Sequence, residues 1–428
     1  MKKILTLLLA LWMLTGCVAM AAGNQLVVGS TTAMSGAFFT DLFGSNTADI
    51  DVRALLHGYN LMSWDHETGT YQINDSVVAG MAVSRDAQNN RVYTFDLYGD
   101  LKFSDGSAIT AKDYAFSILL TASPELAKLG GQSAAVGAIL GMDAYQSGKS
   151  SVLRGVRLLS DTQMSITISK AYEPYFYEMA LFDYSPYPIS VLAPGCKVVD
   201  TEKGVGIVTA SGTGAAIFTA ALVQKTMLDA ATGYMSHPSV VSGPYTLTRY
   251  DAQSGTASFA INPYYKGNED GEKPTIETIV YRTVANDEAI DLLLSGEVDL
   301  LNKMVAADTV SKGIQSTADQ PFAVANYPRS GLSMISFSCE RQTVAGKAVR
   351  QAIASCFDRD ALVKAYTGNF GLKANGYFGI GQWMYQLAAG TIQPPVDDLP
   401  ANATAKEAAA YEKTVAQWDA LSLDKLKD

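Results

Sequence analysis

The stretch Arg91 to Leu120, RVYTFDLYGDLKFSDGSAITAKDYAFSILL, carries three successive structural signals. In 92–97 the large apolar side chains recur at every second position, which is the pattern of a strand with one buried face. Residues 98–100 break this pattern, and Leu101 to Phe103 offers a second short strand. The first two signals therefore predict a hairpin.

The third signal is a helix that begins after the turn residues of 104–107. Thr110 and Asp113 have the spacing of a capping box, in which each side chain binds a backbone N–H at the helix start. Tyr114, Ile118 and Leu119 then continue an apolar helical face. The whole stretch reads as a hairpin followed by a helix.

Two further blocks follow in order. The first runs from 241 to about 300 and contains VSGPYTLTRYD at 241–251, NPYYKG at 262–267 and LLLSGEVDL at 292–300, and the second is VRQAIASCFDRDAL at 349–362. Together with the opening stretch, these blocks resemble the family 5 periplasmic solute-binding proteins, the oligopeptide- and dipeptide-binding components of ATP-driven importers. The resemblance implies an α/β fold of the periplasmic-binding-protein type, with two lobes in the type II, three-subdomain form.

The same resemblance implies a division of the chain into three parts. Residues 24–58 and 172–281 would form lobe I, residues 59–171 a small second subdomain, and residues 282–428 lobe II. A strand at 164–168, where apolar and polar residues alternate, would close the small subdomain.

The N-terminus carries an export signal. Lys2 and Lys3 precede an apolar run of 11 residues from Ile4 to Leu14, well short of the roughly 20 that a spanning helix needs. The residues LTGC that end at Cys17 resemble the lipobox at which bacterial lipoproteins are cut and lipidated. Cleavage after Ala21 is the alternative, and either route takes the mature chain out of the cytoplasm, with any membrane attachment through lipid.

The composition fits an exported soluble protein. The formal net charge is −10, and loss of Lys2 and Lys3 with the signal makes it −12. An acidic chain is a poor candidate for binding nucleic acid, whose backbone demands a basic face. The 428 residues, of which 48% are hydrophobic, allow a large core and favour two or more lobes over one. We expect a monomer.

The cysteines carry little information about function. With Cys17 lipidated, Cys196, Cys339 and Cys356 remain, and their spacing does not match a metal site. We expect buried free thiols, with a Cys339–Cys356 disulfide as the alternative that export permits.

Periodicity and capping residues predict the remaining elements. Strands are expected at 25–29, 245–250, 256–261, 276–281 and 334–337, and helices at 52–61, 218–228, 287–294 and 347–356, followed by a helix capped by Asp358. Leu362 and Tyr366 would be buried in that last helix. The glycine-rich residues 204–214 lack the Gly-Lys-Ser/Thr ending of a phosphate loop and read as a flexible surface loop.

The first candidate ligand contacts follow the first strand. In the resembling family this strand enters the ligand cleft, which makes Ser35, Phe38 and Phe39 cleft candidates. Core packing is the alternative for the two phenylalanines. Residues 172–187, dense in tyrosine and proline, either line a cleft or serve packing alone.

The second set of candidates lies in 368–385, where glycine and aromatic residues alternate. In the resembling family the equivalent loop faces the cleft, so Tyr377, Trp383 and Tyr385 are expected to contact ligand. A satellite hydrophobic cluster is the alternative interpretation.

At the C-terminus, Thr404 and Glu407 form a second capping box before an apolar stripe of Tyr411, Val415 and Trp418. Family members continue well beyond this point, so we expect lobe II to be incomplete, either because the sequence is a fragment or because the gene is truncated. In peptide-binding members the aspartate that pairs with the ligand's α-ammonium lies in that later portion, and no such residue is assigned here.

The sequence shows no assembled catalytic or metal site. His57, His66 and His237 lack metal-ligand spacing, and no Gly-x-Ser-x-Gly elbow surrounds a serine. We expect neither a cofactor nor catalysis, although two carboxylates of a secreted hydrolase could escape detection in a sequence.

The resulting hypothesis is an exported lipoprotein that captures a small peptide between two lobes and delivers it to the permease of an ABC importer. Main-chain hydrogen bonds to an extended ligand would tolerate many side chains. Sugar, nickel or haem are alternative ligands, because relatives with this fold serve them. A non-transport surface or sensor protein is the alternative from another class.

Overall fold

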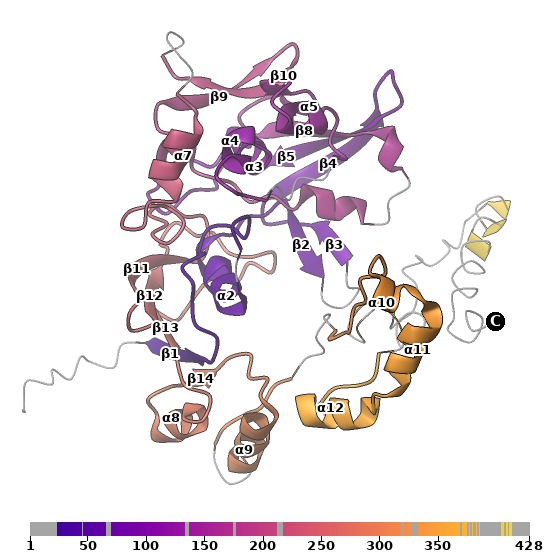
Figure 1. Cartoon of the computed structure of the whole chain (residues 1–428). Helices are drawn as coiled ribbons and strands as arrows, with labels where there is room; N and C mark the ends of the chain where they lie inside the picture. The colour runs from indigo at the N-terminus through magenta and orange to yellow at the C-terminus, as the bar shows by residue number, and fades with distance from the viewer. Residues whose placement is uncertain are drawn as a thin grey trace, which may run out of the picture. The chain divides into compact units, whose positions relative to one another are not determined.

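The structure is a computed structural model. It describes residues 24–412 except 45, 66–69, 133–136, 174–176, 212–216, 318–320, 327–331, 369, 375, 377–378, 380–381, 383–384, 386–403, 406–407 and 410. The chain forms two compact units (Figure 1). The first contains Ile73–Asn302 and the residues up to Ser63, and the second contains Trp64–Gln72 and the residues from Lys303 onward.

A five-stranded mixed sheet is the base of the first unit. Its order is β11 (Tyr245–Asp251), β12 (Thr256–Ile261), β13 (Thr278–Thr283), β1 (Gln25–Ser30) and β14 (Leu300–Leu301). β1 runs parallel to β13 and β14, whereas β12 pairs antiparallel with β11 and β13. The strands predicted at 25–29, 245–250 and 256–261 are confirmed, and β13 begins two residues later than predicted.

Helix α2 (Thr47–Leu56) packs on this sheet. Ala48, Val52 and Leu56 are fully buried on its inner face beside Phe38 and Phe259. The prediction of a helix at 52–61 was wrong at both ends, because its N-cap is Asn46, whose Oδ1 accepts from the N–H groups of residues 48 and 49. The helix stops at Leu56, because the backbone of His57 is extended.

A second, four-stranded antiparallel sheet lies in the same unit, in the order β4 (Val78–Arg85), β5 (Arg91–Leu97), β8 (Gln163–Ile168) and β7 (Val156–Leu158). The alternation at 92–97 correctly predicted β5, and that at 164–168 predicted β8. The hairpin partner was wrong. β5 pairs with β4 and β8, while residues 101–109 close a separate turn in which Phe103 N–H donates to the Ser107 carbonyl.

Helix α3 (Ala111–Thr121) follows this turn, as predicted. The Asp113 carboxylate accepts from Thr110 N–H at 2.8 Å and from Thr110 Oγ at 2.9 Å. Tyr114, Ile118 and Leu119 are fully buried. Burial outweighs these hydrogen bonds and raises the pKa of Asp113 to about 6.

The raised pKa makes stability depend on pH. Between about pH 4 and 6 the folded chain holds a proton on Asp113 that the unfolded chain releases, so this residue's contribution to stability falls as pH rises through that range. Asp113→Asn removes the titration. We expect the unfolding free energy of the variant, relative to wild type, to rise by up to about 3 kcal/mol between pH 4 and 7.

Urea unfolding at several pH values measures this difference. The exposed Asp161, whose side chain is 69% exposed, serves as a matched control in Asp161→Asn. A difference between Asp113→Asn and wild type that stays constant over this pH range would contradict the account.

A three-stranded sheet completes the first unit, in the order β6 (Val152–Leu153), β10 (Gly204–Thr209) and β9 (Cys196–Thr201). The prediction of a flexible loop at 204–214 was wrong for residues 204–209. Gly204 has φ +132°, and a Cβ on it would lie 2.4 Å from the Leu153 carbonyl oxygen. Glycine here permits close strand packing rather than flexibility.

The signature blocks meet between the first two sheets. Lys266 Nζ lies 2.9 Å from Asp100 and 4.6 Å from the centre of the Tyr98 ring. Tyr59 OH accepts from Lys266 N–H at 2.6 Å, and its carbonyl accepts from Tyr114 OH at 2.8 Å. The NPYYKG block and the stretch at 91–120 thus connect the two sheets.

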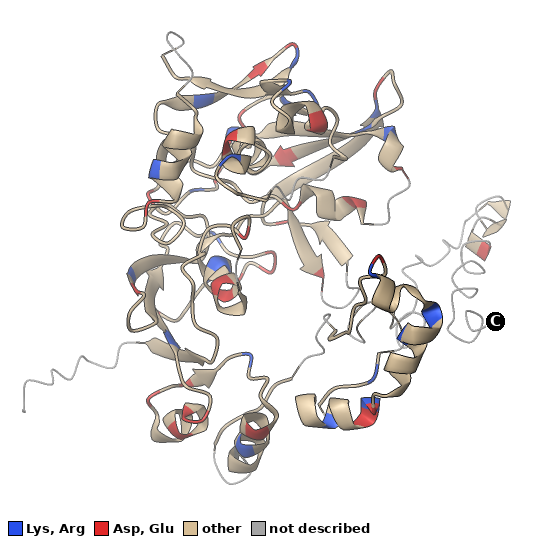
Figure 2. Cartoon of the chain, in the orientation of Figure 1, with Lys and Arg blue, Asp and Glu red and all other residues tan. Residues whose placement is uncertain are grey.

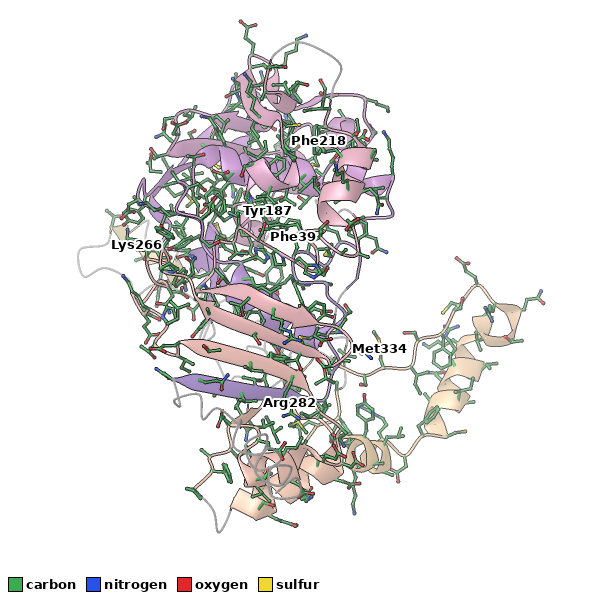
Figure 3. All side chains as sticks on the ribbon, turned by 90° about the vertical axis from the view of Figure 1, so that its left-hand side faces the viewer. Phe39, Tyr187, Phe218, Lys266, Arg282 and Met334 are labelled. Carbon is green, nitrogen blue, oxygen red and sulfur yellow. The ribbon has the colours of Figure 1, made fainter. Side chains whose placement is uncertain are left out.

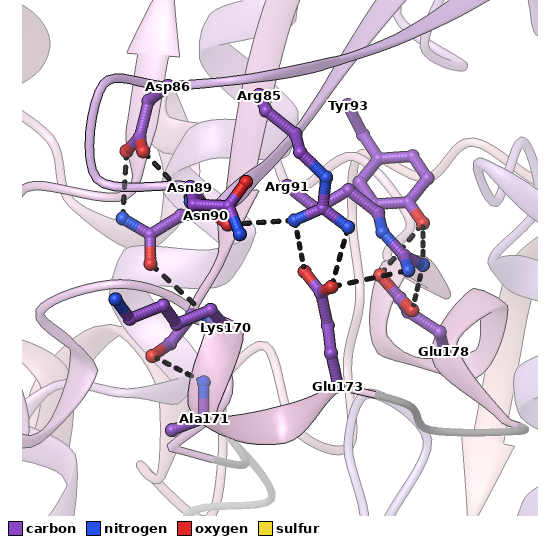
Figure 4. A network of polar contacts seen from close by, with 11 residues as sticks. Arg85, Asp86, Asn89, Asn90, Arg91, Tyr93, Lys170, Ala171, Glu173 and Glu178 are labelled. Carbon is purple, nitrogen blue, oxygen red and sulfur yellow. Dashed lines mark hydrogen bonds and ion pairs between the residues drawn. The ribbon is translucent and has the colours of Figure 1, made fainter.

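A charged network fixes the segment after β8 (Figure 4). Arg85 pairs with Glu173 at 2.7 Å, and Arg91 with Glu178 at 2.6 Å. Tyr93 OH donates to Glu178 at 2.7 Å. These bonds hold Glu173 and Glu178 against β4 and β5.

The remaining helices of the first unit are short, and the second unit is mainly helical. The first unit contains α4 (Pro124–Ala127), α5 (Met142–Gln146), η1 (Lys170–Tyr172), η2 (Glu178–Phe182), α6 (Ile189–Leu192), α7 (Ala220–Met227) and α8 (Ala289–Ser295). The second contains α9 (Ala307–Thr317), α10 (Gln342–Ala345), α11 (Lys347–Ser355) and α12 (Arg359–Thr367). Two further strands, β2 (Met62–Asp65) and β3 (Thr70–Ile73), pair with each other, and the chain passes from one unit to the other within each of them.

Several predictions for the second unit need correction. Residues 334–337 form no strand. Asp358 caps α12 as predicted, but Leu362 and Tyr366 are 48% and 74% exposed, because the described residues place no layer on that face. At the second capping box, Thr404 is described and its carbonyl accepts from Ala408 N–H, whereas Glu407, Val415 and Trp418 lie outside the described residues.

The three described cysteines are free thiols. Cys196 is buried as predicted, whereas Cys339 and Cys356 are exposed, so their predicted burial was wrong. They form no disulfide with each other, and their thiols donate to separate carbonyls, those of Phe337 and Ala352.

Candidate functional site

The parallel strands of the five-stranded sheet end at one edge. β1 ends at Ser30, which pairs with Thr283 at the end of β13, and β14 ends at Leu301 on the other side of β1. Figure 3 shows this sheet, with Arg282 labelled near the end of β13. α/β sheets commonly bind ligands at the carboxyl ends of their parallel strands. The usual place is beside a strand, here β1, from which the sheet extends in both directions.

One carboxylate connects this edge to helix α2. Asp51 Oδ2 accepts from Tyr281 OH at 2.9 Å and from Asn302 Nδ2 at 2.8 Å. Burial raises the pKa of Tyr281 to about 12, so its hydroxyl keeps the proton that it donates. Asp51 therefore ties α2 to two neighbouring positions, because Tyr281 lies in β13 and Asn302 directly follows β14.

A second carboxylate fixes the segment that leaves β1. Asp49 is fully buried and accepts from Ser35 N–H at 2.9 Å, from Ser35 Oγ at 2.6 Å and from Asn46 N–H at 3.1 Å. Asn46 Nδ2 donates to the Ala33 carbonyl at 2.8 Å. Residues 31–35 are thereby held in one conformation on the surface of the first unit.

The backbone of this segment offers unused hydrogen-bonding groups. Within the described part of the chain, the N–H groups of Thr31 and Ala33 have no intramolecular partner. Ala33 and Ser35 are exposed. An extended chain can bind such a rigid backbone by adding main-chain hydrogen bonds.

The structure separates the three candidates after β1. Ser35 lies on the surface at the sheet edge, with its hydroxyl bound to Asp49. Phe38 is fully buried, and its ring packs edge-on against Tyr250 with centroids 4.6 Å apart. Phe39 is 4% exposed, and its ring centroid lies 4.6 Å from that of Tyr187. Figure 3 labels both residues in the interior of the first unit. In this conformation both rings belong to the packed interior, and their role as ligand contacts stays a prediction.

The second set of candidates is only partly described. Tyr377 and Trp383 lie outside the described residues, as does Cys17. Tyr385 is half-buried in the second unit, and its N–H donates to the Gln382 carbonyl at 3.0 Å. Their contact with ligand remains a prediction.

Sequence reasoning missed Asp49, Asp51 and Asn302 as organising residues of the edge. The spacing of Asn46 and Asp49 is a capping-box spacing, and it could have revealed the helix start and the first of these carboxylates. The partners of Asp51 are 230 and 251 residues away in sequence, so no local pattern indicates them.

The family model described as "Bacterial extracellular solute-binding proteins, family 5 Middle" matches residues 76–419. The chain belongs to this family. The match confirms the family resemblance that the three sequence blocks indicated.

Curated relatives of this family 5 protein are peptide-binding proteins by name. The periplasmic oligopeptide-binding protein OppA of Escherichia coli K12 is 24% identical over 305 residues, which cover 70% of this chain and 48% of OppA. The dipeptide-binding protein of Lactococcus lactis subsp. cremoris MG1363 is 26% identical over 338 residues, covering 75% and 54%. The chain thus spans about half the length of these relatives.

Solved structures show the same fold. Lactococcal OppA complexed with an endogenous peptide in the closed conformation gives a TM-score of 0.61 at 18% identity, covering 92% of this chain and 67% of that one. The murein tripeptide binding protein MppA of Escherichia coli gives 0.58 at 17% identity, covering 93% and 67%. The predicted two-lobed α/β periplasmic-binding-protein fold is confirmed.

None of the described helices is long and apolar enough to cross a membrane. No group of three or more His, Cys, Asp or Glu side chains in the described ranges is placed to hold a metal ion. Figure 2 shows Lys and Arg interspersed with Asp and Glu in both units.

Proposed function

We propose that this family 5 protein captures short peptides in extended conformation at the carboxyl edge of the five-stranded sheet and delivers them to an ABC importer permease. The observation that carries the proposal is the rigid segment 31–35, whose Thr31 and Ala33 N–H groups are unused within the described part of the chain. The peptide-binding names of the curated relatives support the same ligand class.

Main-chain recognition explains how one site would accept many sequences. Backbone hydrogen bonds to residues 31–35 would hold the peptide, while its side chains need only space. Ser35 would help to hold the segment in place and would not offer a free hydroxyl to the peptide, because that hydroxyl already donates to Asp49. Tyr377, Trp383 and Tyr385 would supply further apolar contacts to the peptide. Phe38 and Phe39 would touch it only in another conformation, because both rings are buried in this one.

The transport step would be a shift in population. A ligand that binds one conformer better than another raises the share of that conformer, which the permease can then recognise. The export signal and the lipid anchor at Cys17 belong to this proposal as well, since they would keep the protein outside the cytoplasm and close to the permease. The proposed function involves no catalytic step.

Isothermal titration of the purified chain tests the ligand class. Tri- to pentapeptides of different sequence should each release heat with a 1:1 stoichiometry. The matched control is the same tripeptide with (E)-alkene isosteres in place of its peptide bonds, which should bind at least tenfold more weakly because it lacks the carbonyl acceptors that the Thr31 and Ala33 N–H groups would bind. Heat with a sugar, nickel or haem and none with any peptide would contradict the proposal.

A further inference from the structure

A cavity of about 580 Å³ lies in the first unit, on the side of α2 that faces away from the five-stranded sheet. Ile50, Arg53, Ala54 and His57 line it, which is the i, i+3, i+4, i+7 face of that helix. α3 and the tyrosine-rich residues 180–187 supply other parts of the wall. Volumes of this size are typical of sites for small organic ligands.

The cavity has a closed base and an open mouth. Phe39, Ser117 and Ile139 at its base are 4%, 1% and 2% exposed. Ile50 is 47% exposed and Ala54 is also exposed, one helical turn apart on α2. A ligand would therefore enter past α2 and reach an aromatic interior.

One carboxylate on the wall lacks a cation. Asp183 Oδ1 accepts from Asn60 Nδ2 at 2.7 Å, and this neutral amide is the one hydrogen-bond partner of the Asp183 side chain within the described residues. Burial raises the pKa of Asp183. Asp183 is half-buried, and a carboxylate that is partly withdrawn from water is stabilised when a cation pairs with it.

The other charged side chains that line the cavity are one cation, Arg53, and one anion, Asp41, so their formal charges sum to zero. Arg53 Nη1 also donates to the Ala37 carbonyl at 2.9 Å. Burial lowers the pKa of His57 to about 4, so His57 is neutral at pH 7. Asp183 remains as the unbalanced charge.

We infer that this cavity is a second ligand site, which binds a small organic amine with its ammonium group on Asp183 and its apolar body against the rings of Phe39, Tyr184 and Tyr187. The aromatic faces attract a cation, and they also bury the apolar part of the ligand. The site is separate from the sheet edge, because the residues of α2 that line it are not those that fix the edge, Asp49 and Asp51.

Titration of the full chain with 2-phenylethylamine tests this inference. We expect saturable 1:1 binding, at least tenfold tighter than binding of 2-phenylethanol or phenylacetate, which lack the ammonium group. Equal binding of the alcohol and the amine would overturn the role of the carboxylate. Tighter binding of phenylalanine than of the amine would overturn the choice of a simple amine, because the site would then also recognise a ligand carboxylate.

Asp183→Asn should weaken amine binding at least tenfold, and the asparagine can still accept from Asn60, so the fold is preserved. The control Asp161→Asn, at an exposed position that does not line the cavity, should bind the amine like wild type. Unchanged binding by Asp183→Asn would overturn the inference.

A second variant blocks the mouth. Ala54→Trp adds a large side chain at an exposed position of α2, so it should abolish amine binding while the circular dichroism spectrum stays native. Persisting amine binding would place the ligand elsewhere and overturn the inference. Excess tripeptide should leave amine binding unchanged, and both variants should still bind peptide, which separates a failure of this inference from a failure of the proposed function.

Discussion

The Gly243→Ala variant will lose at least about 3 kcal/mol of unfolding free energy, because the added methyl group meets backbone that cannot move aside. A Cβ at this position would lie 2.5 Å from the Leu56 carbonyl carbon and 2.6 Å from the Leu55 oxygen. Gly243 N–H donates to the Leu56 carbonyl, and its own carbonyl accepts from the buried Asn262. These bonds fix the approach between the SGPY turn and the end of α2.

Urea unfolding followed by circular dichroism measures the loss. The matched control is Gly80→Ala, where the added methyl would meet Asp96 at 3.6 Å, an ordinary contact distance. We expect this control to stay within about 0.5 kcal/mol of wild type. A Gly243→Ala variant as stable as the control would show that the approach of the turn to α2 is not tight.

The Asp49→Ala variant will lose about 3 kcal/mol or more and will bind peptide at least tenfold more weakly. Asp49 is fully buried, and its removal leaves Ser35 N–H, Ser35 Oγ and Asn46 N–H without their acceptor. Segment 31–35 would then become mobile, and a peptide would have to order it on binding.

The control for this variant is Asp161→Ala, which removes an exposed carboxylate paired with Lys112 at 2.7 Å. Exposed ion pairs contribute little, so we expect a change below about 1 kcal/mol and normal peptide binding. Peptide affinity that survives in a folded Asp49→Ala variant would separate the segment from the ligand site.

Local patterns predicted the elements whose signals are local. The alternation at 92–97 gave β5, and the Thr110–Asp113 spacing gave the start of α3. The partners of β5 could not be read in the same way, because β4 and β8 are selected by contacts between distant residues. Residues 204–209 look like a loop in sequence, since their glycines are required by strand packing that only the fold reveals.

The candidate site was predictable to the level of a segment. The resemblance pointed to the residues after the first strand, where Ser35 is exposed and bound to Asp49 of α2, and its contact with ligand stays a prediction. Which of the side chains face outward depends on how α2 packs, and this placed Phe38 in the core. The burial predicted for Leu362 and Tyr366 failed for the opposite reason, because an apolar helical face becomes buried only where another layer covers it.

Hydrogen–deuterium exchange with and without a saturating tripeptide tests the central claim most directly. The account predicts slower exchange of the amides in 30–36, including Thr31 and Ala33, when peptide is bound, and little change around α7. Peptide binding that leaves exchange in 30–36 unchanged would contradict it, because the ligand would then be held elsewhere on the chain.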